Sequence, residues 1–206
     1  MELTAWLDRR PLIAILRGVK PDEVMAIAET LERAGIGIVE VPLNSPQPIE
    51  SIARLTRTFG ARLLVGAGTV MTPAQVAEIA GAGGRLIVTP HADGAIVQAA
   101  KHHGLLAVPG FFTPTEAFAM LAAGADALKL FPSEAASPTV LRALRAVLPA
   151  GTPVVPVGGI DASNLAAWRE AGAAGFGIGS AIYRPGDSPE TVGAKAQALL
   201  AVLARS

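Results

Sequence analysis

The chain has 206 residues, and its 17 Lys and Arg residues balance 17 Asp and Glu residues to a formal charge of zero. Without a basic stripe or an acidic tail, a nucleic-acid partner and an electrostatically held membrane partner are both disfavoured. The sequence has no cysteine, which excludes disulfides and thiolate metal sites. No apolar window reaches membrane-spanning length and residues 1–10 lack the apolar core of a signal peptide, so we expect a soluble cytoplasmic protein.

Short apolar runs alternate with helical patterns from residue 12 to the end of the chain. Pro, Thr, Ser or Asp residues open most of the helical segments, as expected for helix starts. The runs are continuously apolar, which is typical of parallel strands covered on their outer face. In chain order, the predicted strand-and-helix pairs are 12–16 and 21–35, 36–43 and 46–59, 63–67 and 72–82, 86–89 and 93–103, 105–108 and 113–123, 127–131 and 137–148, 154–157 and 161–171, and 175–178 and 188–205.

Eight strand-then-helix units with short connections are what a (β/α)8 TIM barrel requires, and the chain length fits the lower end of that fold. We therefore predict an α/β protein with one domain over residues 1–206, a (β/α)8 TIM barrel with an N-terminal helix. The alternative is an open doubly wound sheet, which usually has fewer strands and a GxGxxG turn after the first one. The segment Leu16-Arg17-Gly18-Val19-Lys20 is no such turn.

Polar residues interrupt or follow the predicted strands where a barrel places its active site. The carboxyl ends of the strands meet at one face of such a barrel, so these residues should converge there. Three histidines without a nearby cluster of carboxylates disfavour a metal site, and none is predicted. The converging residues are Arg17, Glu40, Asn44, Thr69, Thr89, Pro90, His91, Lys129, Gly158, Gly159, Gly179 and Ser180.

Lys129 lies within an apolar run, and lysine is rarely buried without a partner or a purpose. If Lys129 faces the barrel interior, Leu128 and Leu130 face the helices, whereas the opposite register would bury the charge beneath those helices. Desolvation lowers the pKa of a buried amine, which makes a neutral nucleophile available. The alternative is an outward-facing lysine whose amine reaches the rim of the barrel.

Glu40 is flanked by Val39 and Val41, so the same alternation points its side chain into the barrel. A carboxylate beside a lysine in a dry interior is suited to moving protons during a reaction. The alternative is a buried ion pair with Lys129 or Arg17 that is kept for structure, although buried pairs are weak evidence for stability.

Gly158-Gly159 and Gly179-Ser180 follow the last two predicted strands, where barrels frequently bind phosphate through backbone N–H groups. Glycine allows close approach of a ligand to the backbone, and Ser180 adds a hydroxyl. Ordinary Gly-rich loops are the alternative. Arg17 as a site residue would clamp a carboxylate with help from the Thr69 hydroxyl, and otherwise it would simply cover the rim.

These residue types describe a metal-independent aldolase that needs no cofactor. A neutral buried lysine attacks a ketone and forms an iminium, which draws electrons from the adjacent carbon–carbon bond. A carboxylate moves protons during these steps. A carboxylate clamp and a phosphate cradle would hold a phosphorylated sugar acid by both ends.

Five segments, in order and at matching spacing, resemble the 2-keto-3-deoxy-6-phosphogluconate (KDPG) and 4-hydroxy-2-oxoglutarate (KHG) aldolase family over nearly the whole chain. They are Val39-Glu40-Val41-Pro42-Leu43-Asn44-Ser45-Pro46, Gly66-Ala67-Gly68-Thr69-Val70, Val88-Thr89-Pro90, Lys129-Leu130-Phe131-Pro132 and Val157-Gly158-Gly159. The resemblance implies a class I aldolase, a homotrimeric (β/α)8 barrel, Lys129 as the Schiff-base lysine and Glu40 as the acid and base. It also implies further substrate contacts: Arg17 and Thr69 at the pyruvate carboxylate, Pro90 and Phe131 as pocket walls, and Gly158, Gly159, Gly179 and Ser180 at the phosphate.

Within that family, the sequence looks more like the 6-phosphogalactonate branch. Pro42-Leu43-Asn44-Ser45-Pro46 stands where many phosphogluconate enzymes have an arginine-containing segment, and Val157 stands where they typically carry threonine. A threonine hydroxyl there could read the C4 hydroxyl configuration, whereas valine cannot hydrogen-bond. The branch implies cleavage of 2-dehydro-3-deoxy-6-phospho-D-galactonate to pyruvate and D-glyceraldehyde 3-phosphate.

Three alternatives stay open at this point. The first is cleavage of the gluconate epimer or of 4-hydroxy-2-oxoglutarate by the same chemistry. The second is a phosphosugar isomerase or epimerase that uses Glu40 without an imine, and the third is a barrel that binds a phosphosugar without turnover. Phe111-Phe112 is bulkier than the family pattern and is expected to narrow the mouth of the pocket.

Overall fold

A computed structural model describes residues 2–205, and Met1 and Ser206, the two ends of the predicted domain, lie outside the described residues. The strands are β1 (Leu12–Ile15), β2 (Ile38–Pro42), β3 (Leu64–Gly68), β4 (Leu86–Val88), β5 (Leu106–Val108), β6 (Gly110–Phe111), β7 (Leu128–Leu130), β8 (Val154–Pro156) and β9 (Phe176–Ile178). The helices are α1 (Leu3–Arg9), α2 (Val24–Ala34), α3 (Pro48–Phe59), α4 (Pro73–Gly81), α5 (Gly94–His102), α6 (Pro114–Ala122), α7 (Pro138–Arg145), α8 (Leu165–Glu170) and α9 (Pro189–Leu203), with a 3-10 turn η1 (Ser133–Ala135).

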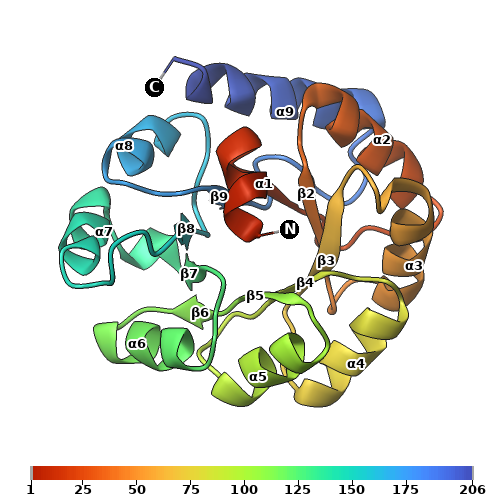
Figure 1. Cartoon of the computed structure of the whole chain (residues 1–206). Helices are drawn as coiled ribbons and strands as arrows, with labels where there is room; N and C mark the ends of the chain where they lie inside the picture. The colour runs from red at the N-terminus through yellow and green to blue at the C-terminus, as the bar shows by residue number, and fades with distance from the viewer. Residues whose placement is uncertain (1, 206) are drawn as a thin grey trace.

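The strands form two parallel sheets that curl around a common centre. The larger sheet has the order β5-β4-β3-β2-β1-β9, and the smaller has the order β6-β7-β8. Figure 1 shows the strands inside a ring formed by α2 to α9, while α1 lies across one end of the ring. The predicted α/β class, with a parallel sheet covered by helices and an N-terminal helix, is confirmed.

Backbone hydrogen bonds link the edges of the two sheets. The Asp126 N–H, just before β7, donates to the Ala107 carbonyl of β5 at 2.9 Å, and the Ala174 N–H, just before β9, donates to the Val154 carbonyl of β8 at 2.9 Å. An isolated parallel bridge pairs Val157 with Gly177 on the second of these edges. The two sheets are therefore joined at both edges, between β5 and β7 and between β8 and β9.

The sequence predicts one strand at 105–108, but the chain forms β5 and then the separate short strand β6. Pro109 lies between them and has no N–H to donate, so it interrupts the ladder. The following N–H, from Gly110, donates instead to the Thr89 hydroxyl at 3.1 Å. In a second difference, the helix predicted from residue 46 begins at Pro48, because Gln47 has a left-handed φ of 44° that a helix does not continue.

The apolar side chains divide into two buried clusters, one inside the strands and one between the strands and the helices. Ile13 and Ile15 of β1 belong to the inner cluster, whereas Leu12 and Ala14 belong to the outer one. Leu3 and Leu7 place α1 against the inner cluster, at the end where the strands begin. Alternation along each strand therefore decides which residues reach the interior, as expected for a pleated strand.

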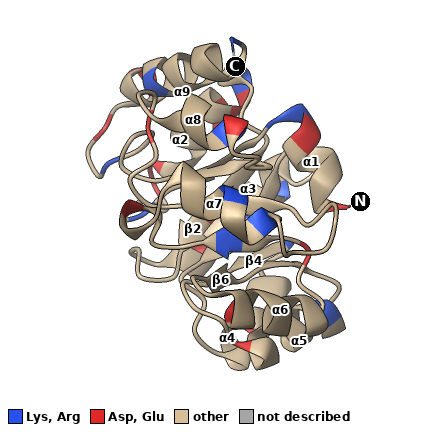
Figure 2. Cartoon of the chain, turned by 90° about the vertical axis from the view of Figure 1, so that its left-hand side faces the viewer, with Lys and Arg blue, Asp and Glu red and all other residues tan. Residues whose placement is uncertain are grey.

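Charged side chains lie mostly on the outer helices and loops, and Figure 2 shows few on the strands. In the described part of the chain, no helix combines the length and the apolar character needed to cross a membrane. The interior enclosed by the strands is largely apolar, so water screens the charge of a side chain placed there only weakly.

Candidate active site

Lys129 points into the centre of the molecule from β7. Its neighbours Leu128 and Leu130 pack in the cluster beneath the helices, so the predicted inward orientation of Lys129 is confirmed and the outward alternative is wrong. The residue is 5 % exposed. Burial lowers the pKa of the amine, the negative charge of Glu40 opposes this, and the positive charge of Arg17 lowers the pKa further. A larger neutral fraction of the amine is the state required for nucleophilic attack.

Glu40 points into the same interior from β2, because Val39 and Val41 face the helices. Burial is the main cause that raises its carboxyl pKa to about 7, against the opposing effects of Lys129, Arg17 and a hydrogen bond with the Gly68 backbone. One carboxylate oxygen, Oε2, has no hydrogen-bond partner in the described chain. A pKa near neutrality lets the group both give and take a proton.

The structural alternative for Glu40 is not observed. Within residues 2–205, neither Lys129 nor Arg17 lies close enough to Glu40 to form an ion pair. Their charges act on the pKa of Glu40 from a longer distance. An orphaned carboxylate oxygen in a buried position costs stability.

Gly68 on β3 makes room for this carboxylate. A Cβ atom at residue 68 would overlap both carboxylate oxygens of Glu40, and the overlap with Oε2 is the more severe. Gly66, directly opposite Glu40 in the strand register, likewise has no space for a Cβ because the Leu86 carbonyl lies there. The inner face of β3 therefore carries no side chains beside Glu40, and the carboxylate occupies that space.

Arg17 and Thr69 come together at the carboxyl ends of β1 and β3, as predicted. The Arg17 Nη1 donates to the Asn44 side-chain oxygen at 2.6 Å and reaches the Thr69 hydroxyl at 3.5 Å. Thr69 has a φ of 55°, in the left-handed region that a β-branched residue rarely adopts. Such strain is typically retained at binding sites. Asn44, which the sequence singled out only by position, holds the guanidinium.

The remaining predicted wall residues differ in placement. The Phe131 ring lies beside the lysine, with its centroid 4.7 Å from the Lys129 Nζ. Pro90 is half-buried against β6, where a Cβ on Gly110 would lie 2.5 Å from the Pro90 carbonyl carbon. Phe111 packs in the outer cluster and Phe112 is exposed at 40 %, and neither lines the cavity described next. These two phenylalanines therefore do not narrow this cavity.

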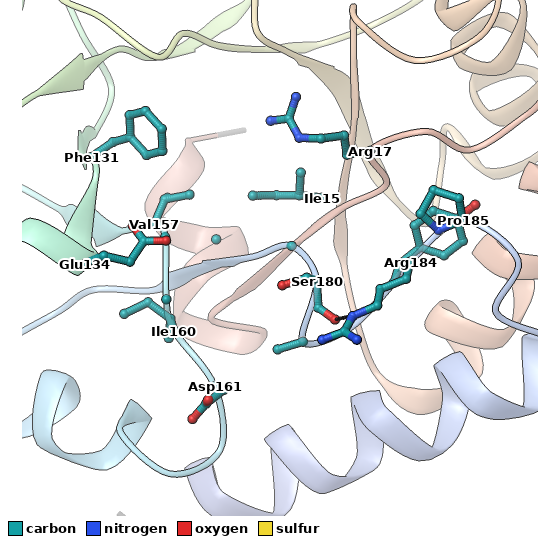
Figure 3. Close-up of a pocket in the computed structure, with 16 residues that line it drawn as sticks. Ile15, Arg17, Phe131, Glu134, Val157, Ile160, Asp161, Ser180, Arg184 and Pro185 are labelled. Carbon is teal, nitrogen blue, oxygen red and sulfur yellow. Dashed lines mark hydrogen bonds between the residues drawn. The ribbon is translucent and has the colours of Figure 1, made fainter.

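A cavity of about 420 Å³ opens above the carboxyl ends of β7, β8 and β9. Figure 3 shows Arg17, Phe131, Val157 and Ser180 around it. Lys129, Glu40, Thr69 and Pro90 are absent from its lining, since the first two lie deeper in the interior. The predicted residues that line the cavity are Arg17, Phe131, Val157, Gly158, Gly159, Gly179 and Ser180.

Ser133 of η1 fixes the wall that carries Val157. Its hydroxyl donates to the Leu130 carbonyl at 2.9 Å and accepts the Val157 N–H at 3.1 Å. The Ser133 N–H donates to the Val157 carbonyl at 2.9 Å. This buried serine links the ends of β7 and β8, and no pattern in the sequence marked it. The sequence also gave no sign of the cavity residues Glu134 and Arg184.

The described residues contain no group of three His, Asp or Glu side chains positioned to hold a metal ion. The histidine nearest to the predicted site, His91, is half-buried after β4, with its Nε2 3.9 Å from the Asp93 carboxylate. The described residues of the predicted site include an amine, a carboxyl group and a guanidinium.

Comparison with known proteins gives one consistent result. The family model for KDPG and KHG aldolase matches residues 3–188. The chain is 47 % identical to the 2-dehydro-3-deoxy-6-phosphogalactonate aldolase of Escherichia coli K12, over 95 % of each chain. It is 45 % identical to a probable enzyme of the same name from Rhizobium meliloti, over 93 % of this chain and 91 % of the relative. A solved structure named "Native KDPGal structure" superposes with a TM-score of 0.93, at 46 % identity and 95 % coverage of each chain.

Proposed function

The chain belongs to the KDPG and KHG aldolase family and is an aldehyde-lyase, and from this premise we propose that its substrate is 2-dehydro-3-deoxy-6-phospho-D-galactonate. The products are pyruvate and D-glyceraldehyde 3-phosphate. The observation that carries the proposal is the pair of buried groups, Lys129 with a lowered pKa and Glu40 with a pKa raised to about 7, facing one interior. The high identity to relatives named for this substrate supports the choice of sugar acid.

Lys129 and Glu40 carry the bond changes in this proposal. The Lys129 amine adds to the C2 ketone, and loss of water gives an iminium. Glu40 then accepts the proton of the C4 hydroxyl while the C3–C4 bond breaks and its electrons move toward the iminium nitrogen. The aldehyde leaves, Glu40 returns the proton to C3 of the enamine, and water hydrolyses the iminium to release pyruvate and restore the lysine.

The remaining residues hold the substrate at both ends. We assign the C1 carboxylate to Arg17 and Thr69, because their side chains meet at the carboxyl ends of β1 and β3. Phe131 and Pro90 form walls of the pyruvate part, of which Phe131 touches the amine. Gly158, Gly159, Gly179 and Ser180 line the cavity that takes the phosphate.

Val157 lies between the lysine and the phosphate end and is buried at 7 % exposure. Because it cannot donate a hydrogen bond, it favours the epimer whose C4 hydroxyl points away from it. Replacing Val157 with Thr is expected to shift the ratio of kcat/KM values toward the gluconate epimer by about tenfold, the value of one hydrogen bond. Steady-state rates on both C4 epimers give this ratio.

The matched control for this prediction is Val155→Thr, which adds the same hydroxyl to the inner face of β8 at a lower level. It should leave the ratio of the two epimers unchanged. A wild-type preference for the gluconate epimer would overturn the galactonate assignment and would favour the KDPG and KHG activity instead.

Metal removal tests a second aspect of the proposal. Since Lys129 supplies the electron sink and the described residues hold no candidate metal cluster, EDTA treatment is expected to leave kcat and KM unchanged within error. The measurement is the cleavage rate before and after dialysis against EDTA. A loss that Mg²⁺, Mn²⁺ or Zn²⁺ restores would contradict the imine mechanism.

We also propose that the two sheets form one closed (β/α)8 barrel and that the chain is one domain. The hydrogen bonds from Asp126 to Ala107 and from Ala174 to Val154 support closure at both edges. A homotrimer is proposed from the family resemblance alone, and light scattering of the purified protein gives the mass that tests it.

A further inference from the structure

Four charged residues line the cavity, and two of them already have tasks within the protein. The Arg17 guanidinium is held by Asn44 at the pyruvate end. The Asp161 carboxylate accepts hydrogen bonds from the backbone N–H and the hydroxyl of Ser163, at 2.8 and 2.6 Å, and so closes its own turn. Arg184 and Glu134 are left, and neither has a role in the bond-breaking steps.

Arg184 is held against the residue that lines the phosphate end. Its Nε donates to the Ser180 carbonyl at 3.2 Å, and Figure 3 shows the guanidinium lying along Ser180. Its two terminal nitrogens have no hydrogen-bond partner among the described residues. The nearest acid in sequence, Asp187, is engaged by the Lys195 amine at 2.6 Å and by the Arg184 backbone N–H at 2.8 Å. The cation is therefore available to a ligand.

Glu134 occupies the opposite wall of the same cavity. A Cβ on Gly158 would overlap the Glu134 carboxylate, and one on Gly159 would lie 2.6 Å from the Glu134 Cγ. The side chain therefore rests on the two glycines that we assign to the phosphate. Figure 3 shows it beside Val157, across the cavity from Arg184 and Ser180. A carboxylate in this place repels an anion that binds to the same glycines.

We propose that Arg184 is the cation that binds the substrate's phosphate, and that Glu134 is a counter-charge that weakens its hold on phosphorylated ligands. Backbone N–H groups and a serine hydroxyl provide geometry but little charge, whereas a guanidinium adds charge-assisted hydrogen bonds to phosphate oxygens. The opposing carboxylate limits the affinity, which favours release of the phosphorylated aldehyde after cleavage. This inference rests on the proposed function, because it assumes that the phosphate occupies this cavity.

The test compares Arg184→Gln, Arg184→Lys and Glu134→Gln with a control, Arg33→Gln. Arg33 lies on the exposed face of α2, where it pairs with Glu29 at 3.5 Å, so the control removes one positive charge outside the cavity. We expect Arg184→Gln to raise KM for the phosphorylated substrate about tenfold, or about 1.4 kcal/mol, with kcat nearly unchanged. Arg184→Lys should retain part of the affinity, and Glu134→Gln should lower KM about threefold.

Inorganic phosphate, used as a competitive inhibitor of cleavage, gives a second measurement that reports on binding of the phosphate group alone. Its inhibition constant should rise in Arg184→Gln, fall in Glu134→Gln and stay constant in Arg33→Gln. Unchanged KM and inhibition constants in Arg184→Gln, or weaker phosphate binding in Glu134→Gln, would overturn the inference. Borohydride trapping of pyruvate on Lys129 separates this from the proposed function: trapping should be equal in all variants, and its absence in the wild type would instead refute the imine mechanism.

Discussion

Replacing Lys129 with Met is expected to abolish aldol cleavage, with a loss in kcat/KM of about 10⁴-fold or more, because the electron sink cannot form without the amine. The wild-type protein, treated with pyruvate and sodium borohydride, should gain the mass of a reduced pyruvate adduct on Lys129. The Lys129→Met protein should gain none. Mass spectrometry of the intact protein and of its peptides measures both outcomes.

A matched control is available on the surface. Lys101 on α5 is partly exposed and pairs with the Asp126 carboxylate at 2.7 Å, so Lys101→Met removes a lysine of ordinary environment. It should keep both activity and trapping. Methionine also suits the buried position of Lys129, since an apolar group of similar length replaces a desolvated amine. Activity that survives in Lys129→Met, or a wild type that shows no adduct, would favour an isomerase, an epimerase or a binding protein.

Replacing Glu40 with Gln is expected to lower kcat by about 10²- to 10⁴-fold, the usual contribution of a positioned acid and base. The amide keeps the shape of the carboxyl group, so it should still fit beside Gly68. The variant should lose less of its pyruvate trapping on Lys129 than of its cleavage rate, because cleavage of the carbon–carbon bond needs the proton acceptor directly. A Glu40→Gln enzyme with wild-type kcat would remove this residue from the mechanism.

The wild-type pH profile should carry the signature of Glu40. Its carboxyl pKa is raised to about 7, so the fraction ionised, and with it the acid limb of kcat/KM, should rise through pH 7.

The same pKa shift has the opposite effect on the stability of the fold. The folded pKa lies above the unfolded value of about 4.5, so the free energy of unfolding falls as the pH rises between those values, by about 3 kcal/mol in all.

Glu40→Gln therefore separates chemistry from folding. Thermal unfolding at pH 8 should show a Tm at least equal to that of the wild type, since the variant no longer buries a charge. A large drop in Tm would mean that Glu40 supports the structure, and the loss of activity would then need no chemical explanation.

The inward positions of Lys129 and Glu40 could be predicted because both lie singly in apolar strands, where a period of two leaves only one sensible register. The helices and strands followed for the same reason, from continuous apolar runs and helix-start residues. The break at Pro109 was harder to foresee. A run of apolar residues does not show which group each backbone N–H will bond to. Here the Gly110 N–H donates to the Thr89 hydroxyl instead of to a neighbouring strand.

Glu134 and Arg184 could not be found from sequence because each is an ordinary charged residue in a polar connection. Their proposed roles depend on contacts that form only in the folded chain: Glu134 packs on Gly158 and Gly159, and Arg184 is hydrogen-bonded to Ser180. The placement of Phe111 and Phe112 could not be predicted for a related reason. The short strand β6 turns one of them beneath the helices and the other toward solvent, and only its pairing with β7 determines this.

Gly68 limits which substitutions the site can accept. The Glu40 carboxylate occupies the space where a side chain at position 68 of the neighbouring strand β3 would lie. This space exists only because residue 68 is a glycine. We therefore expect residues 40 and 68 to be an epistatic pair, in which a larger residue at position 68 is tolerated only when Glu40 is replaced by a shorter residue. Libraries that seek new substrates by varying only the groups that touch substrate would leave this pair fixed, and any redesign of the proton-transfer group has to vary both positions together.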